Sequence, residues 1–91
     1  MLDEKILTLH PQGKSGKNIS RKTYDTIKTA MLQALKNKEL THNELFEQIA
    51  KILNGKYKGN ISWYSETVKL DLEARKLIKR TSSKPQKYTL E

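Results

Sequence analysis

The sequence predicts a mainly α domain that ends in a small antiparallel sheet, an α+β fold with three helices. Two observations support this fold class. Hydrophobic residues recur at helical spacing in three stretches between residues 20 and 76, separated by polar or Gly-containing segments. A short apolar run at 77–80, a turn at 81–85 and an alternating run at 86–90 then predict two paired strands.

The first helix is expected to begin after Ser20, whose hydroxyl can accept a hydrogen bond from a free N–H group at the helix start. Ile19 and Tyr24 flank this position at the spacing of a hydrophobic staple. The helix is expected to end near Asn37. Its buried face is predicted at three- and four-residue steps: Tyr24, Ile27, Met31, Ala34 and Leu35.

The second predicted helix has the clearest start signal. Thr41 and Glu44 have the spacing of a capping box, in which each side chain binds the other residue's backbone N–H. Asn54 and Gly55 are expected to end the helix. Leu40, just before it, is expected to pair briefly with the C-terminal strands. The predicted buried stripe consists of Leu45, Ile49, Ile52 and Leu53.

The third helix is expected from Ser62 to Lys76 and is apolar on two sides. Such a helix is typical of the centre of a small domain, so Trp63 and Tyr64 are expected in the core. Asp71 and Arg75 are four residues apart, and we expect them to form a structural ion pair. One apolar stripe consists of Trp63, Leu70, Ala74 and Leu77, and the other of Tyr64, Val68 and Leu72.

Residues 1–19 are expected to form an N-terminal arm with a Gly-rich loop, ahead of a domain at 20–91. The loop at 10–17 contains two glycines and a proline, which argues against regular structure there. The short apolar piece from Ile6 to Leu9 precedes this loop. It could pair as a strand or pack against the domain.

Composition excludes several protein classes. The chain has 91 residues, no cysteine and no apolar run near the ~20 residues of a membrane span. We therefore expect one cytoplasmic domain without disulfides, thiol chemistry or membrane contact. The two histidines lack metal-ligand spacing and stand beside no nucleophile motif. The sequence thus predicts no enzyme activity, no metal, no cofactor and no small-molecule ligand.

The charge distribution indicates an anionic partner. The net charge is +8, and nucleic acid is the commonest partner of a small basic domain. Residues 20–38 carry five basic side chains against one acidic side chain, and residues 77–91 carry four against one. Lys56 and Lys58 add charge to the linker before the third helix. The alternative is that the charge serves solubility alone.

Helix, strand, basic turn and strand form the order in which a winged helix-turn-helix domain ends, with a two- to three-stranded antiparallel sheet. When such a domain binds DNA, the third helix enters the major groove and the wing contacts the backbone. No arginine stands among the expected groove residues, so we expect modest, salt-sensitive binding. The predicted nucleic-acid-binding residues are Lys56, Lys58, Asn60, Ser62, Ser65, Lys69, Lys79, Arg80, Lys84 and Lys87.

Residues 72–80 resemble the helix-to-wing junction of bacterial winged-helix regulators, with Lys76 where those proteins prefer glycine. The chain also resembles a family of small uncharacterised bacterial proteins over nearly its whole length. The resemblance supports the fold and implies no activity. It is carried by His10-Pro11-Gln12-Gly13, by Tyr24-Asp25, and by Trp63-Tyr64 followed by Thr67 to Arg75.

These observations favour a non-enzymatic winged-helix protein that binds double-stranded DNA through the third helix and a basic wing. It would be a transcriptional regulator or a nucleoid-associated protein, and it could form a homodimer. The alternative is a protein-interaction or dimerisation module on the same scaffold, without DNA binding. The neutral third helix and the ratio of three arginines to fifteen lysines favour that alternative. An exposed apolar patch at Ile6, Leu7 and Leu9 would support it.

Overall fold

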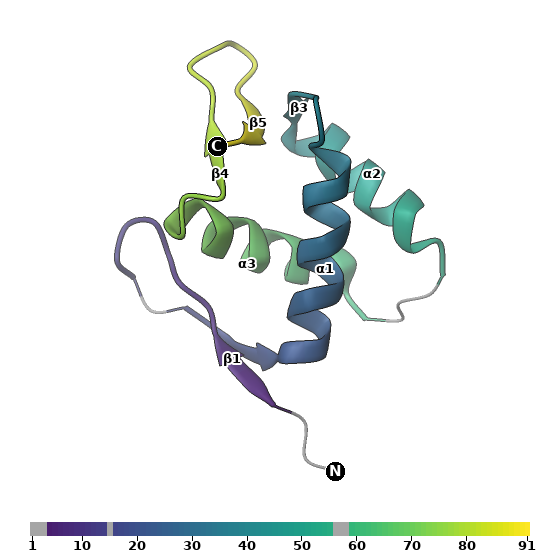
Figure 1. Ribbon diagram of the computed structural model, residues 1–91, viewed down its shortest axis with the longest axis vertical. Coiled ribbons are helices and arrows are strands. Elements are labelled where there is room, and N and C mark those ends of the chain that lie inside the picture. The colour runs from purple at the N-terminus through teal and green to yellow at the C-terminus, as the bar shows by residue number, and fades with distance from the viewer. Residues whose placement is uncertain (1–3, 15, 56–58) are drawn as a thin grey trace.

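The computed structural model describes residues 4–14, 16–55 and 59–91. Within these residues, three helices and two small antiparallel sheets form an α+β fold, as predicted (Figure 1). The elements in order are β1 (Lys5–Leu7), β2 (Asn18–Ser20), α1 (Arg21–Ala34), β3 (Leu40–Thr41), α2 (His42–Leu53), α3 (Ile61–Ala74), β4 (Ile78–Arg80) and β5 (Lys87–Leu90).

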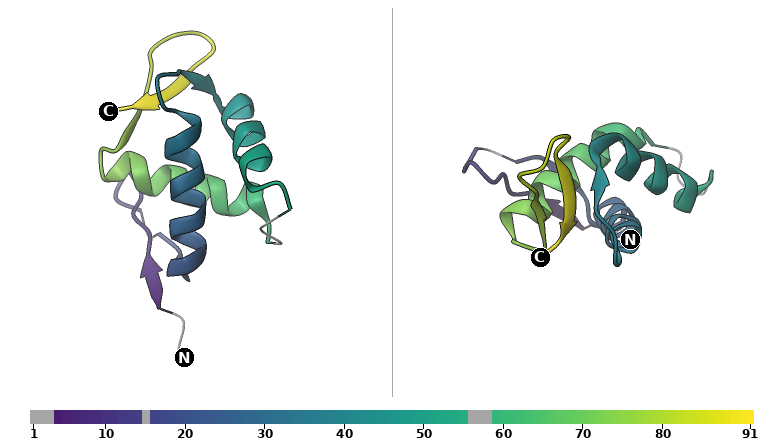
Figure 2. Two further views of the ribbon diagram at one scale, coloured as in Figure 1. Left: turned by 45° about the vertical axis from the view of Figure 1, so that its right-hand side comes forward. Right: turned by 90° about the horizontal axis from the view of Figure 1, so that it is seen from above.

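The two sheets lie at opposite ends of the molecule, with α1 running between them (Figures 1 and 2). β1 and β2 form an antiparallel hairpin with Ile6 opposite Ile19. The second sheet has the order β3-β5-β4, and both of its pairings are antiparallel. Leu40 lies opposite Tyr88, which confirms the predicted pairing of Leu40. β4 therefore occupies one edge of this sheet, and its other side carries no described strand.

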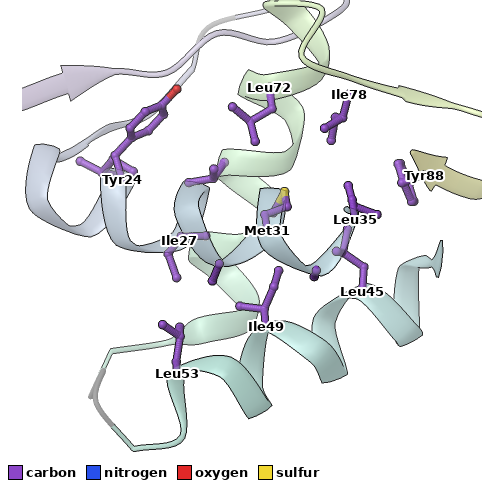
Figure 3. Packing of buried hydrophobic residues seen from close by; sticks show 14 residues of the cluster. Tyr24, Ile27, Met31, Leu35, Leu45, Ile49, Leu53, Leu72, Ile78 and Tyr88 are labelled. Atoms are coloured by element: carbon purple, nitrogen blue, oxygen red, sulfur yellow. The ribbon is translucent and has the colours of Figure 1, made fainter. Parts of the chain in front are cut away.

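The hydrophobic core lies between the three helices and one face of the three-stranded sheet (Figure 3). The buried faces predicted for the first two helices are confirmed, except that Ile52 is only partly buried. Ile19 of β2 also belongs to the core, whereas the predicted domain boundary after it stays a prediction. The core side chains labelled in Figure 3 are Tyr24, Ile27, Met31, Leu35, Leu45, Ile49, Leu53, Leu72, Ile78 and Tyr88.

The helix starts follow local sequence signals to different degrees. The capping box is confirmed, because the Glu44 N–H donates to Thr41 Oγ1 over 3.3 Å and the Thr41 N–H donates to Glu44 Oε1 over 2.9 Å. The predicted cap by the Ser20 hydroxyl is wrong, since this side chain makes no capping hydrogen bond. Ser20 belongs to β2, and the Arg21 N–H instead donates to the Glu4 carbonyl over 2.8 Å.

The orientation of α3 differs from the prediction. The stripe containing Val68 and Leu72 faces the core, whereas the stripe that begins with Trp63 faces away from it. Trp63 is 45% exposed, so its expected place in the core was wrong. The buried arc includes two charged residues, Lys69 and Asp71, which can lie there because tyrosines on other elements bind them.

α3 ends in a tight turn without glycine. Lys76 has a φ of 63°, in the left-handed region. The Leu77 N–H donates to the Leu72 carbonyl over 2.9 Å, and the Lys76 N–H donates to the Glu73 carbonyl over 3.1 Å. These two bonds form a Schellman motif. They direct the chain into β4, although the left-handed conformation costs a residue other than glycine roughly 1–2 kcal/mol.

The apolar piece of the N-terminal arm pairs as a strand, one of the two alternatives left open. Beyond β1, the Thr8 N–H donates to the Lys17 carbonyl over 2.8 Å, and Thr8 Oγ1 accepts from the Lys17 N–H over 2.8 Å. Gly16 makes this closure possible, because a Cβ atom there would lie 1.7 Å from the Thr8 carbonyl oxygen. The arm loop therefore has a closed base.

Candidate functional site

An open groove of about 610 Å³ lies between the loop after β1, the outward face of α3 and the edge strand β4. We call it the α3–β4 groove. These three segments lie together on the left of Figure 1. Its lining residues are His10, Pro11 and Gln12 of the arm, Glu66, Leu70, Glu73 and Lys76 from α3 and its end, Ile78, Lys79 and Arg80 of β4, and Glu91.

Tyr88 of β5 holds two basic side chains beside this groove. Lys69 Nζ lies 3.0 Å from Tyr88 Oη and 4.5 Å from the centroid of its ring. The guanidinium carbon of Arg80 lies 5.5 Å from the same centroid. Cations are attracted to the negative face of an aromatic ring. The ring therefore helps to keep both cations in place.

Two carboxylates of α3 complete this arrangement. Glu66 Oε1 lies 3.3 Å from Lys69 Nζ, and Glu66 Oε2 lies 3.8 Å from His42 Nδ1. Glu73 accepts hydrogen bonds of 2.7 and 3.1 Å from Arg80 Nε and Nη2. These bonds raise the pKa of Arg80 above its ordinary value. The charges of Lys69 and Arg80 are thus matched within the fold.

The burial of α3 corrects part of the predicted nucleic-acid site. Ser65 and Lys69 are 0% and 2% exposed, so neither can contact DNA in this structure. The aliphatic stem of Lys69 lies inside the protein, and its ammonium group is bound by Tyr88 and Glu66. Arg80 is on the surface, but its guanidinium binds Glu73.

The remaining predicted residues are dispersed. Ser62, Lys79 and Lys84 are exposed, and Lys87 is half-buried. The Asn60 side chain caps α3, because its Oδ1 accepts from the Trp63 N–H over 3.0 Å. Lys56 and Lys58 lie outside the described residues. The structure therefore places the exposed predicted lysines on the β4–β5 hairpin (78–90) and none of them on α3.

Comparison with known proteins identifies the family of this chain. Residues 5–88 match DUF6958, described as a family of unknown function. The chain belongs to DUF6958. This agrees with the expected resemblance to a small family without established activity. No curated protein and no solved structure matches the chain.

Two further findings concern the described part of this DUF6958 chain. None of its helices is long and apolar enough to cross a membrane. Within the same residues, no group of three or more histidine, aspartate or glutamate side chains is placed to hold a metal ion.

Asp71 fastens the N-terminal arm of this DUF6958 chain to the helices. Its predicted ion pair is confirmed, because Arg75 Nε lies 2.9 and 3.1 Å from the two carboxylate oxygens. The Leu9 N–H also donates to Asp71 over 2.8 Å, and the Tyr24 hydroxyl donates to its other oxygen. Burial and the hydrogen bond to Asp71 raise the pKa of Tyr24 to about 12.

Sequence reasoning missed the roles of Leu9 and Tyr24. The available signal was that a fully buried carboxylate needs more donors than one arginine supplies.

The outward stripe of α3 was missed as a surface for another reason. Its mostly apolar residues recur at four- and three-residue steps, which is also the spacing of a buried helix face, and Glu66 and Glu73 border it. The stripe consists of Trp63, Thr67, Leu70, Ala74 and Leu77.

The arm lies along one flank of this stripe in the DUF6958 chain. Leu9 and His10 line a small cavity of about 70 Å³ together with Thr67 and Leu70 of α3. Trp63 and Leu77, at the two ends of the stripe, remain exposed. The outward face of α3 is therefore apolar and acidic, and it is partly flanked by the chain's own arm.

Proposed function

We propose that this chain is a non-enzymatic, cytoplasmic protein-interaction module on a winged-helix scaffold, and that the α3–β4 groove binds the partner. The observation that carries the proposal is the character of the outward face of α3. The order α1, β3, α2, α3, β4 and β5 supports the scaffold, because β3 pairs with the C-terminal hairpin in a sheet of order β3-β5-β4, as the first strand does in winged helices.

A helix that reads DNA presents polar and basic side chains to base edges and phosphates. Here the corresponding face carries exposed Trp63, and Leu70 lines the groove between Glu66 and Glu73. Because Lys69 and Arg80 pair with these two carboxylates, this face offers no free basic group of α3 to a phosphate. A central aromatic or aliphatic residue with a polar rim is typical of protein interfaces. Leu7 and Leu9 of the arm are exposed as well, which gives part of the apolar patch expected of an interaction module.

Site-specific photo-crosslinking in cells tests this proposal. A photoreactive phenylalanine derivative at Trp63 keeps an aromatic ring on the outward stripe of α3, two helical turns before Leu70, which lines the groove. The matched control carries the same group at exposed Glu47 of α2, a helix that contributes no residue to the groove lining. We expect protease-sensitive, nuclease-resistant adducts from position 63 and not from position 47. Nucleic-acid adducts at position 63, or no adducts there, would overturn the proposal.

A second candidate is binding of double-stranded DNA through phosphates alone, as a regulator or nucleoid-associated protein. It is favoured by Lys79, Lys84 and Lys87 on the β4–β5 hairpin and by the net charge of +8. Such contacts position a protein without reading sequence.

Titration of labelled protein with generic duplex DNA at two salt concentrations tests this second candidate. Neutralising about six phosphates predicts a roughly thousandfold loss of affinity between about 50 and 200 mM salt. Lys84→Glu with Lys87→Glu should weaken binding, whereas Lys51→Glu on α2 should have a smaller effect. Unchanged binding by the double variant would exclude the hairpin as the DNA site.

A further inference from the structure

We infer that residues 8–13 of the arm form a cover, which shields the middle of the outward stripe of α3 and opens as a unit while the helices stay folded. This inference rests on the proposed protein-binding function and adds its regulation, because a partner that uses the whole stripe must displace the cover. It is carried by the burial pattern of the stripe, by the few contacts that hold the cover, and by the polar network that stays complete without it.

The outward stripe of α3 is shielded at its middle and exposed at its ends. Trp63 and Leu77, the end residues, are 45% and 39% exposed. Residues of the cover share a small cavity with the middle of the stripe and a second, more open hollow with its C-terminal part. The cover therefore lies against the part of the stripe that is least exposed. The stripe residues between the two ends are all half-buried: Thr67, Leu70 and Ala74.

Few contacts hold the cover to the helices. Within the described residues, one hydrogen bond joins them, from the Leu9 N–H to Asp71 over 2.8 Å. The Leu9 side chain is 44% exposed, and the cavity of about 70 Å³ between Leu9 and α3 leaves part of the two surfaces out of contact. A segment that buries little apolar surface opens at a small cost in free energy. The cover is therefore expected to open well before the core unfolds.

The cover keeps its shape through bonds of its own. The Gly13 N–H donates to the His10 carbonyl over 2.9 Å, and the Gln12 N–H donates to His10 Nδ1 over 3.1 Å. Thr8 is buried, and both its N–H and its hydroxyl are bonded to the backbone of Lys17 in the same arm. None of these bonds involves α3. The loop can therefore leave the helix without breaking them.

Asp71 remains paired when the cover leaves. Besides the Leu9 N–H, its carboxylate accepts hydrogen bonds from the Tyr24 hydroxyl and from Arg75 Nε. The large penalty of a buried charge arises when the charge loses its partner, and Arg75 lies on the same helix as Asp71. Opening therefore exchanges one backbone hydrogen bond for hydration of the Leu9 N–H, an exchange with a small net effect.

The hairpin beneath the cover anchors it to the core. Ile19 of β2 is 4% exposed, and Ile6, opposite it in β1, packs partly against the core. The cover also forms one wall of the α3–β4 groove through the segment from His10 to Gln12. Opening would therefore widen the proposed partner site and join Trp63 and Leu77 into one continuous, mostly apolar face.

Native-state hydrogen exchange of the intact protein measures the opening. The Leu9 amide should exchange at least about tenfold faster than the core amides of α2. Low concentrations of urea should change its rate little, because a local opening exposes little surface. The inference is overturned if Leu9 exchanges with the rate and the urea dependence of the core amides, since the cover would then leave only when the whole domain unfolds.

Fluorescence of the neutral apolar dye Nile red measures whether the stripe becomes accessible. Gly16→Ala should displace the cover, because a Cβ atom there would lie 1.7 Å from the Thr8 carbonyl oxygen. We expect several-fold higher dye fluorescence with Gly16→Ala than with the wild type. Lys14→Ala, at an exposed position of the same loop, should leave the fluorescence unchanged. Adding Leu70→Ala to Gly16→Ala should remove most of the gain.

The amide spectra of α1 and α2 report that each variant is folded. No gain in fluorescence for a folded Gly16→Ala, or a gain that survives Leu70→Ala, would overturn the shielding of the stripe. If Leu9 opens only with the core while position 63 still crosslinks to protein, the proposed function stands and its regulation falls. If the cover opens locally but position 63 captures no protein, the shielding of a partner site falls together with the proposed function.

Discussion

Replacing Asp71 by asparagine is expected to lower the free energy of unfolding by about 2–4 kcal/mol. The carboxylate is 0% exposed and accepts hydrogen bonds from Leu9, Tyr24 and Arg75. Breaking a buried ion pair costs roughly 3–5 kcal/mol. The Arg75 side chain is 36% exposed and can regain water, which reduces this cost. The new amide N–H₂ could donate to the Tyr24 hydroxyl, but it cannot accept from Arg75, whose guanidinium loses its charged partner.

Urea denaturation at neutral pH, followed by fluorescence of the single tryptophan Trp63, measures this change. Asp25→Asn is the matched control, because Asp25 lies on the surface with its carboxylate 4.0 Å from Arg21 Nε. The free energy of unfolding of this control should stay within about 0.5 kcal/mol of the wild-type value. Amide hydrogen exchange should also show faster exchange of the Leu9 N–H in Asp71→Asn.

The reasoning would be refuted if Asp71→Asn and Asp25→Asn were equally stable. It would also be refuted if the Leu9 amide in Asp71→Asn exchanged its hydrogen as slowly as in the wild type. Either result would mean that the buried carboxylate does not fasten the arm to α3.

Three further predictions concern Tyr24, Lys76 and Gly16. Because the pKa of Tyr24 is raised to about 12 in the fold, its contribution to stability is complete below the ordinary tyrosine pKa and is lost as pH rises toward the folded value. Tyr24→Phe should remove that part of the decrease in the free energy of unfolding at alkaline pH, measured by urea denaturation at several pH values. Lys76→Gly should raise the free energy of unfolding by about 1 kcal/mol, because glycine adopts the left-handed conformation without strain. An unchanged free energy of unfolding in urea denaturation would contradict strain at Lys76. Gly16→Ala should displace the arm loop, since no space exists beside the Thr8 carbonyl. The Leu9 amide should then exchange faster while α2 amides keep their protection.

Much of the fold could be predicted because its signals are local. The capping box of Thr41 and Glu44 involves residues three positions apart, and the structure contains it as expected. The C-terminal hairpin follows from an alternating run after a turn, and β4 and β5 pair there. The pairing of Asp71 with Arg75 is equally local, because four residues make slightly more than one helical turn.

The orientation of α3 could not be predicted from its own residues. Both stripes are apolar, and the stripe of Trp63 is the larger, so periodicity alone favours burying both. The choice depends on partners remote in sequence, since Lys69 is bound by Tyr88 and Asp71 by Tyr24. The expected exposure of Ser65 and Lys69 was wrong for the same reason. Whether a lysine or arginine is free depends on tertiary contacts that composition does not contain.

The contact between Leu9 and Asp71 also constrains the order in which the chain can assemble. These residues are 62 positions apart, so the arm leaves the ribosome long before its acceptor exists. At about 5–20 residues per second, the delay is roughly 3–12 s. During that interval β1 and the arm residue Leu9 have no α3 to dock against, although α1 and α2 are completed before the interval ends. The arm is thus synthesised before the helices and is among the last segments of this fold that can reach their native place.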